Sequence, residues 1–381
     1  MNNGSGFFLK GRGTNSVCVI ALSTSIFFTS LFFTCRVFHH RIDTSKSINK
    51  LQIKSQKQHS TSRSHVTNSS CKRFAFVDCS VSAGLGHRFG EIVLSMLFAD
   101  SLNAAFVFDD RCWQESGPHG EYSWFYEFFP FGDSYITWSQ MVSITRDSHK
   151  WIDGEWGDVE RRANGVLNRS CDVTFRTQWN MCSGSCFENA SIVGSFELVK
   201  WRMREVYSKS RFHPSIRLFN SCKETNTLSV ALHMRSGDII LNNDRSYTVN
   251  ILNEIKGIVS DLPFHVFIFG EDVIENFKFF PEVCETILNA SCTFPKISVA
   301  DTLHHLIQTD ILVTSGSSFP ITAALFRENK ITLTSIPKEG TNTIYGTWDD
   351  IKLSSDGLIV RKKNFDETIC HLRILYFSQF A

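Results

Sequence analysis

Three segments in the carboxyl half of the chain share one design, a short apolar run that ends in polar residues. They occupy residues 228–238, 265–272 and 311–326. Continuous apolar runs of this length are typical of strands buried on both faces of a parallel sheet. Helical patterns at residues 247–261 and 299–309 separate the runs. Since parallel strands need helical crossovers, this alternation predicts an α/β fold.

The polar tips of these runs predict a binding site. Ligands of open α/β sheets bind beyond the carboxyl ends of the strands, and a guanidinium there can bind phosphate through two parallel hydrogen bonds. Small residues at a helix amino end also bind phosphate, and Pro320 indicates that a helix starts near residue 319. An arginine and an aspartate at a strand end can instead tie a turn together. The residues concerned are His233, Arg235, Asp238, Glu271, Asp272, Ser315, Ser317, Ser318 and Phe319.

A similar unit, a strand, a helix and a second strand, begins near residue 74. The pattern predicts strands at residues 74–79 and 104–110 with a helix at residues 88–102 between them. The intervening loop contains Gly84, Gly86, His87 and Arg88. Its glycines let the backbone approach a ligand closely, although a Gly-x-Gly pair after a strand is also typical of a simple tight turn.

These motifs, in this order, resemble the donor half of the fucosyltransferase superfamily, which includes α-1,2 and α-1,6 enzymes and protein O-fucosyltransferases. Residues 233–238 are similar to its His-x-Arg-Arg-Gly-Asp motif, residues 269–272 to its Ser-Asp-Asp turn, and residues 314–319 to its Ser-Ser-Phe motif. The resemblance covers roughly residues 74–336. It implies a GT-B-like fold, with two Rossmann-like domains that face a cleft, and a GDP-sugar donor, GDP-fucose.

The expected chemistry is an inverting transfer of the sugar without a metal cofactor. Negative charge builds on the departing diphosphate, and Arg235 with the Ser317–Ser318 loop would stabilise it. His233 would hold Arg235 or a phosphate oxygen. The resemblance implies that Asp272, with Glu271 behind it, accepts hydrogen bonds from the guanine edge or the ribose.

The base that takes the proton from the acceptor hydroxyl is left open by the sequence. Glu91, one helical turn beyond the glycine loop, and Asp238 are both candidates, although Asp238 can also brace the Arg235 loop. The acceptor would be a glycan or glycoprotein. Tryptophans at residues 111–211 can stack on sugar rings or pack between domains.

Two other functions fit parts of the sequence. Asp109 and Asp110 at a strand end could hold a metal in a metal-dependent glycosyltransferase. The chain could also be a non-catalytic lumenal binding protein on a transferase scaffold. Ser236 and His87 favour that alternative, because many relatives carry Arg and Asn at these two positions.

Length and composition set the domain organisation. The chain has 381 residues, of which 42% are hydrophobic, and a net charge of +1. This is enough for two domains, and it gives no electrostatic case for nucleic acid as a partner. We expect an acceptor-side domain at residues 71–224 and a nucleotide-sugar-binding domain at residues 225–381.

The amino-terminal region predicts a membrane anchor. Residues 17–34 carry no charge and are just long enough to span a bilayer, between a short tail at residues 1–16 and a polar, flexible stem at residues 35–70. A cleaved signal peptide is the alternative. Basic residues are more numerous after the segment than before it, which alone would put the carboxyl side in the cytoplasm.

Two features favour a lumenal body instead, and with it a Golgi membrane protein of type II. Four glycosylation sequons follow the apolar segment, at Asn68, Asn168, Asn189 and Asn289. Ten of the twelve cysteines also lie after residue 70, and several of them, Cys284 and Cys292 included, lie in loop-like segments where disulfides fit.

Overall fold

The fold is seen in a computed structural model of the chain. The described residues are 72–78, 84–114, 123–145, 149–166, 172–178, 190–219, 222, 226–234, 245–259, 262–271, 273–288, 292–314, 317–327, 331–335, 351–353 and 359–360. The predicted anchor, the stem and the four sequons lie outside them. Among these residues, no helix combines the length and the apolar character that a membrane crossing requires.

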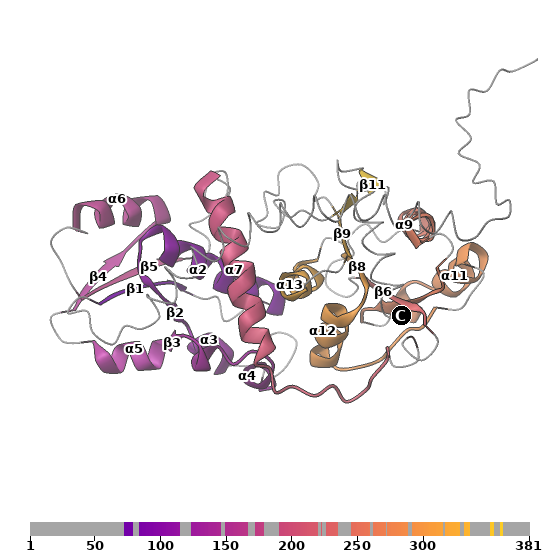
Figure 1. Cartoon of the computed structure of the whole chain (residues 1–381), viewed down its shortest axis with the longest axis horizontal. Helices are drawn as coiled ribbons and strands as arrows, with labels where there is room; N and C mark the ends of the chain where they lie inside the picture. The colour runs from indigo at the N-terminus through magenta and orange to yellow at the C-terminus, as the bar shows by residue number, and fades with distance from the viewer. Residues whose placement is uncertain are drawn as a thin grey trace, which may run out of the picture. The chain divides into compact units, whose positions relative to one another are not determined.

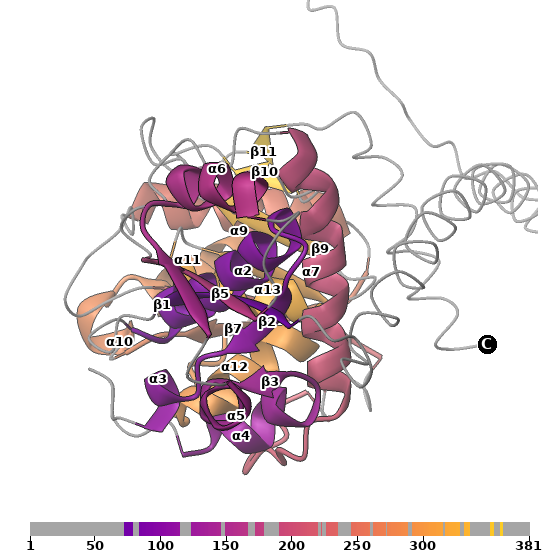
Figure 2. The same cartoon turned by 90° about the vertical axis from the view of Figure 1, so that its left-hand side faces the viewer.

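The amino-terminal half contains a parallel sheet with the strand order β3-β2-β1-β5-β4 (Figures 1 and 2). All neighbouring strands in it pair in parallel. The strands are β1 (Arg73–Asp78), β2 (Ala105–Phe108), β3 (Ile136–Thr137), β4 (Lys150–Asp153) and β5 (Val173–Gln178). The helices of this half are α2 (Leu85–Ser101), α3 (Arg111–Gln114), α4 (Phe125–Phe128), α5 (Trp138–Ile144), α6 (Trp156–Val166) and α7 (Ala190–Ser208), with the 3-10 turn η1 (Phe131–Asp133).

Alternation along β1 separates the two faces of this sheet. Ala75 and Val77 belong to the main core together with residues of α2, whereas Phe74 and Phe76 pack with Met141 of α5. Both views show α6 and α5 on opposite sides of the sheet (Figures 1 and 2). Helices on both faces are what a parallel sheet needs to bury its strands.

The carboxyl-terminal half contains a second sheet, with the order β11-β10-β9-β8-β6-β7. Only the β10–β11 pair is antiparallel among its described strands. The strands are β6 (Leu228–His233), β7 (Phe264–Phe269), β8 (Ile311–Thr314), β9 (Ile331–Ser335), β10 (Ile351–Leu353) and β11 (Ile359–Val360). The helices are α9 (Arg245–Val259), α10 (Val273–Asn276), α11 (Phe280–Leu288), α12 (Val299–Gln308) and α13 (Ser318–Phe326).

The α/β fold with parallel sheets is therefore confirmed. The three apolar runs form β6, β7 and β8, and the two helical patterns between them form α9 and α12. Between residues 111 and 224, for which the sequence analysis named no helix or strand, the structure places β3, β4, β5 and α3 to α7. The domain boundary between residues 224 and 225 stays a prediction.

One core joins helices of both sheets. Phe326 of α13 lies with its ring centroid 5.6 Å from that of Phe89 in α2 and 4.6 Å from that of Phe129. These three side chains belong to the same buried cluster as Val199 of α7 and Leu303 of α12. Helix α13 is thus held by apolar burial against α2, which brings the start of each helix close to the other.

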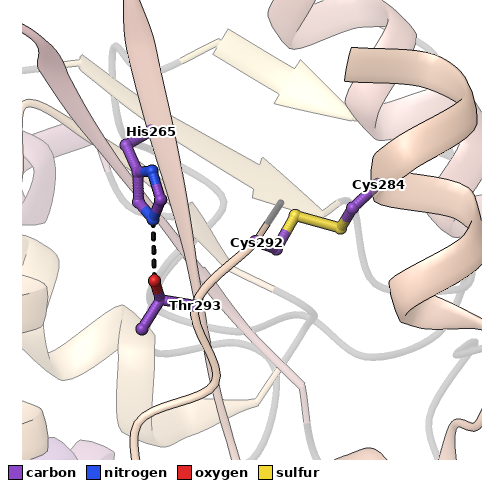
Figure 3. Close-up of a disulfide and its surroundings, with 4 residues drawn as sticks. All are labelled: His265, Cys284, Cys292 and Thr293. Carbon is purple, nitrogen blue, oxygen red and sulfur yellow. Dashed lines mark hydrogen bonds between the residues drawn. A yellow bond between two sulfur atoms is a disulfide. The ribbon is translucent and has the colours of Figure 1, made fainter. Parts of the chain in front are cut away.

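A disulfide anchors the segment around Thr293 that pairs with the edge strand β7 (Figure 3). Cys284 in α11 is bonded to Cys292, with a Cα–Cα distance of 5.9 Å, so the expectation of disulfides in this region is confirmed for this pair. Thr293 then forms a bridge with β7: its N–H donates to the Val266 oxygen and its oxygen accepts from the Ile268 N–H. The added segment pairs backbone groups that an edge strand would expose.

The segment between α7 and β6 is tied to α12 by a histidine. The Nε2 atom of His305 accepts from the Leu218 N–H at 3.2 Å, and its Nδ1 atom lies 2.7 Å from the Asp301 backbone oxygen. Only the neutral ring, with its proton on Nδ1, can make both hydrogen bonds. Asp301 itself accepts from the backbone N–H and the hydroxyl of Ser215, so residues 215–218 are held at two points.

This contact predicts a pH-dependent stability. Burial lowers the pKa of His305 from its ordinary value of 6.5, so the unfolded chain takes up this proton at higher pH than the folded chain does. The contribution is therefore complete above pH 6.5 and is lost as pH falls through the folded pKa. We expect His305→Phe to cost about 1–2 kcal/mol at neutral pH, because it removes both hydrogen bonds, and to flatten the decline of stability below pH 6.5.

Urea unfolding measured from pH 7.5 to pH 4.5 checks this prediction. Part of the slope should persist in the variant, because burial also lowers the pKa of His149 and of His265. Replacing the exposed His213 by phenylalanine is the control and should leave the slope unchanged. A slope equal to that of the unchanged chain in His305→Phe would contradict the role assigned to His305.

Candidate functional site

The second sheet reverses its strand order beside β6. The chain moves from β6 to β7 on one side and then to β8 on the other side of β6. Crevices beyond the carboxyl ends of strands at such a reversal are where open α/β sheets bind ligands. His233 ends β6, with Thr314 of β8 and Phe269 of β7 as its register neighbours. His233 therefore lies at the reversal point.

Helix α13 begins next to His233. The ring centroid of His233 lies 5.3 Å from that of Phe319, a residue in the first turn of α13. Ser317 is the N-cap residue and is only 3% exposed, and no side-chain hydrogen bond caps this helix. Pro320 follows in the first turn, where a missing N–H costs nothing. The N–H groups of the first turn are thus not used by a side-chain cap, and they carry the positive end of the helix dipole.

The predicted glycine loop is in fact the start of α2, since Gly84 caps the helix and Gly86, His87 and Arg88 lie in its first turns, and this start meets the start of α13. A Cβ atom on Gly86 would lie 2.6 Å from the carbonyl carbon of Ser318 and 2.7 Å from the Phe319 nitrogen, and it would also overlap the Ser318 hydroxyl. Gly84 is the N-cap of α2, which also has no side-chain cap hydrogen bond. Two helix starts from different sheets therefore come together, and only a residue without a Cβ fits between them.

The tip of β7 packs on the tip of β6. The Met234 N–H donates to the Phe269 oxygen at 2.8 Å. Gly270 has a φ of +157°, and a Cβ atom there would overlap the Met234 oxygen, which explains the glycine in this turn. Glu271 follows and is exposed. Glu271 therefore lies just beyond the end of β7, at the same edge of the sheet as His233, as the motif order predicts.

The polar residues near the start of α2 differ in burial. His87 is exposed, whereas Arg88 and Glu91 are 1% and 3% exposed. A side-chain N–H of Arg88 donates to the Cys112 backbone oxygen. Both side chains line a small, partly open cavity of about 20 Å³, room for one water molecule. This position favours a structural role for Arg88 and Glu91 over direct contact with a large substrate.

The two aspartates proposed as metal ligands have separate partners. Asp109 accepts from Nε and Nη2 of Arg111 at 2.7 and 2.6 Å, and Asp110 accepts from the Ser139 hydroxyl at 2.8 Å. Burial is the main cause that raises the pKa of Asp109, against the opposing effect of Arg111. Across the residues that the structure describes, no group of three or more His, Cys, Asp or Glu side chains could hold a metal ion.

Several residues of the predicted site lie outside the described ranges. They are Arg235, Asp238, Asp272 and Ser315. The structure brings together His233, Ser317, Ser318, Phe319 and Gly86. Sequence reasoning missed Thr314 as the register partner of His233, although its place at the end of an apolar run was the available signal.

Comparison with known proteins gives structural likenesses alone. No protein-family model and no curated protein matches the sequence. A crystal structure of POFUT1 in complex with GDP-fucose aligns with a TM-score of 0.36 and 12% identity, over 68% of this chain and 95% of that one. NodZ α-1,6-fucosyltransferase co-crystallised with GDP aligns with a TM-score of 0.36 and 11% identity, over 68% and 93% of the two chains.

A third solved structure belongs to another transferase. The E. coli heptosyltransferase WaaC with ADP-2-deoxy-2-fluoro heptose aligns with a TM-score of 0.33 and 12% identity, over 81% of this chain and all of that one. Fucosyltransferases, which the sequence motifs resemble, are thus among the solved structures that the chain is similar to. Because these TM-scores lie below 0.5, the likeness carries no weight for the function of this chain.

Proposed function

We propose that this protein is a glycosyltransferase that moves fucose from GDP-fucose to a glycan or glycoprotein acceptor by a metal-independent inverting mechanism. The support is the motif order in the sequence together with the meeting of three motif segments in the fold. We further propose that the body is lumenal and anchored in the Golgi membrane through residues 17–34.

The observation that carries the proposal is the convergence at the carboxyl edge of the second sheet. His233 at the end of β6, the start of α13 at Ser318 and Phe319, and Gly86 at the start of α2 come from separate parts of the sequence. Apolar packing of α13 on α2 holds these segments together. The N–H groups at the start of α13 then lie beside His233, and several donors near one point are what a diphosphate site needs.

The chemistry follows from where charge develops. Cleavage of the bond between the anomeric carbon and the diphosphate leaves negative charge on phosphate oxygens. The N–H groups at the start of α13 and the guanidinium of Arg235 would stabilise that charge. His233, beside Phe319, would donate a hydrogen bond to a phosphate oxygen. Glu271 would accept hydrogen bonds near the nucleoside, together with Asp272.

Acceptor activation needs a base that reaches solvent. Glu91 is 3% exposed and lines a cavity with room for only one water molecule, so its carboxylate is poorly placed to contact an acceptor hydroxyl. The proposal therefore assigns proton removal to Asp238, which belongs to the same motif as Arg235. With Asp238 as the base, transfer proceeds by direct attack of the acceptor oxygen on the anomeric carbon, with inversion.

Nucleotide binding and turnover test the proposal together. We expect GDP to raise the Tm of the full-length chain by a few degrees and UDP to leave it unchanged, because a ligand that binds only the folded state stabilises it. GDP release from GDP-fucose in the presence of acceptors should continue in a strong chelator. Arg235→Ala should lower this turnover at least tenfold and leave the Tm without nucleotide unchanged.

The exposed Arg217 provides the matched control, since Arg217→Ala should retain full turnover. Loss of activity on chelation would instead indicate the metal-dependent alternative. A Tm shift with GDP but no turnover over a broad acceptor panel would indicate a binding protein on a transferase scaffold. No shift with either nucleotide would refute the proposal.

A further inference from the structure

A row of ion pairs runs along the carboxyl edge of the first sheet, far in sequence from the second sheet. Arg176 of β5 binds Asp153 of β4 through Nε and Nη2, each at 3.1 Å. On its other side Arg176 lies 3.6 Å from Asp78, which ends β1, and Arg111 lies 3.0 Å from Asp78. Arg111, in α3, also binds Asp109, which follows β2, so five charges alternate in sign from β4 to the end of β2.

Two tryptophans lie against this row. The guanidinium of Arg111 is 3.9 Å from the ring centroid of Trp138, and that of Arg176 is 5.9 Å from the ring centroid of Trp151. The two indole rings lie 5.6 Å apart, and Phe76 packs edge-on beneath both. Cation–π attraction holds the guanidinium groups in place beside the rings.

Register places these side chains on one face of the sheet. Trp151 and Asp153 pair with Thr174 and Arg176, and Arg176 pairs with Phe76. Helix α5 packs on β2 and β3 on this face, whereas α6 packs on β4 and β5 from the opposite side of the sheet (Figure 1). Beside Trp151 on β4 lies His149, whose ring centroid is 6.1 Å away. Trp151 is 42% exposed. Because Trp151 lies on the edge strand β4, part of its indole ring is open to a ligand.

The chemistry of this face suits a neutral sugar. The apolar side of a pyranose presents C–H groups that pack on the electron-rich face of an indole ring. Neighbouring hydroxyls of the ring can donate to Asp153 and Asp78 and accept from Arg176, all of which are partly exposed. Because the ion pairs nearly cancel, the face exerts little attraction on phosphate. Two indole rings are also small beside the ~800 Å² that each partner of a stable protein complex contributes.

We propose that the face formed by Trp138, Trp151, Asp153, Arg176 and Asp78 binds a neutral oligosaccharide, with one pyranose ring stacked on Trp151. This inference rests on the proposed function in one respect, since the bound oligosaccharide would be the acceptor of the transfer. The sugar-binding step itself does not depend on the donor.

Titration of the full-length chain with cellotriose, chitotriose, N-acetyllactosamine and sialyllactose tests this inference, with binding followed by saturation-transfer NMR. At least one of the three neutral oligosaccharides should bind. Trp151→Ala should weaken that binding about tenfold, and Trp151→Phe should recover most of it, because an aromatic face is restored. Asp153→Asn should also weaken binding, while the GDP-induced Tm shift stays unchanged in all three variants.

Matched controls separate binding from stability. Ile216→Ala removes an apolar side chain of similar exposure, 45%, and Arg161→Gln removes an exposed ion pair with Asp158. Neither should change sugar binding. Equal affinity in Trp151→Ala and the unchanged chain, or no binding of any neutral oligosaccharide, would overturn the inference. Trp151-dependent sugar binding without a GDP shift would retain the inference and refute the proposed donor.

Discussion

Arg327→Met is expected to lower the free energy of unfolding by about 3–5 kcal/mol. Arg327 is 3% exposed and donates to five backbone oxygens, those of Leu306, Ile307, Thr309, Asp310 and Ile331, at 2.8 to 3.3 Å. Leu306 and Ile307 lie in the last turn of α12, where the backbone carbonyls have no partner within the helix and the helix dipole favours a cation. Methionine would leave all five acceptors buried without these donors.

Equilibrium unfolding in urea measures this loss, and a fall in Tm of about 10 °C should accompany it. Arg161→Met is the matched control, because the side chain of Arg161 is 80% exposed and pairs with Asp158 in the same helix. That change should cost less than about 0.5 kcal/mol. A loss below 1 kcal/mol in Arg327→Met would show that water or a shifted backbone can replace the guanidinium.

Gly86→Ala is expected to destabilise the chain by about 2–3 kcal/mol, although glycine to alanine in a helix normally stabilises by roughly 0.5–1 kcal/mol. The reversed sign follows from the contact with Ser318 and Phe319, where a Cβ would meet the backbone of α13 and not the end of a flexible side chain. Relief requires the two helix starts to separate. The variant should therefore lose the GDP-induced Tm shift as well.

Gly157 offers a close control. It is the second residue of α6, as Gly86 is the second residue of α2, and a Cβ there would have nothing within 4 Å. Gly157→Ala should raise the unfolding free energy slightly and keep the response to GDP. Stabilisation by Gly86→Ala of the same size as that by Gly157→Ala would mean that α2 and α13 do not touch in solution.

The elements around the donor motifs follow directly from local patterns. The apolar runs before His233 and Thr314 became β6 and β8, and Pro320 marked the first turn of α13. These features depend on side-chain periodicity and on backbone chemistry within a few residues, which a single sequence contains. The order of β4 and β5 does not follow in this way. Strand β5 lies between β1 and β4, and its partners are chosen by long-range packing.

By itself, the sequence determined the α/β class, the buried strands with polar tips, and the resemblance to fucosyltransferases, because each is encoded in short stretches. Only the tertiary structure decided that Gly86 touches Ser318, that Glu91 is buried, and that Asp109 faces Arg111. No local pattern in the sequence indicated the alternating charges beside Trp151. The contact of Gly86 with Ser318 and the row of charges from Asp153 to Asp78 depend on helix packing and sheet register, and register is set by the whole core and not by neighbouring residues.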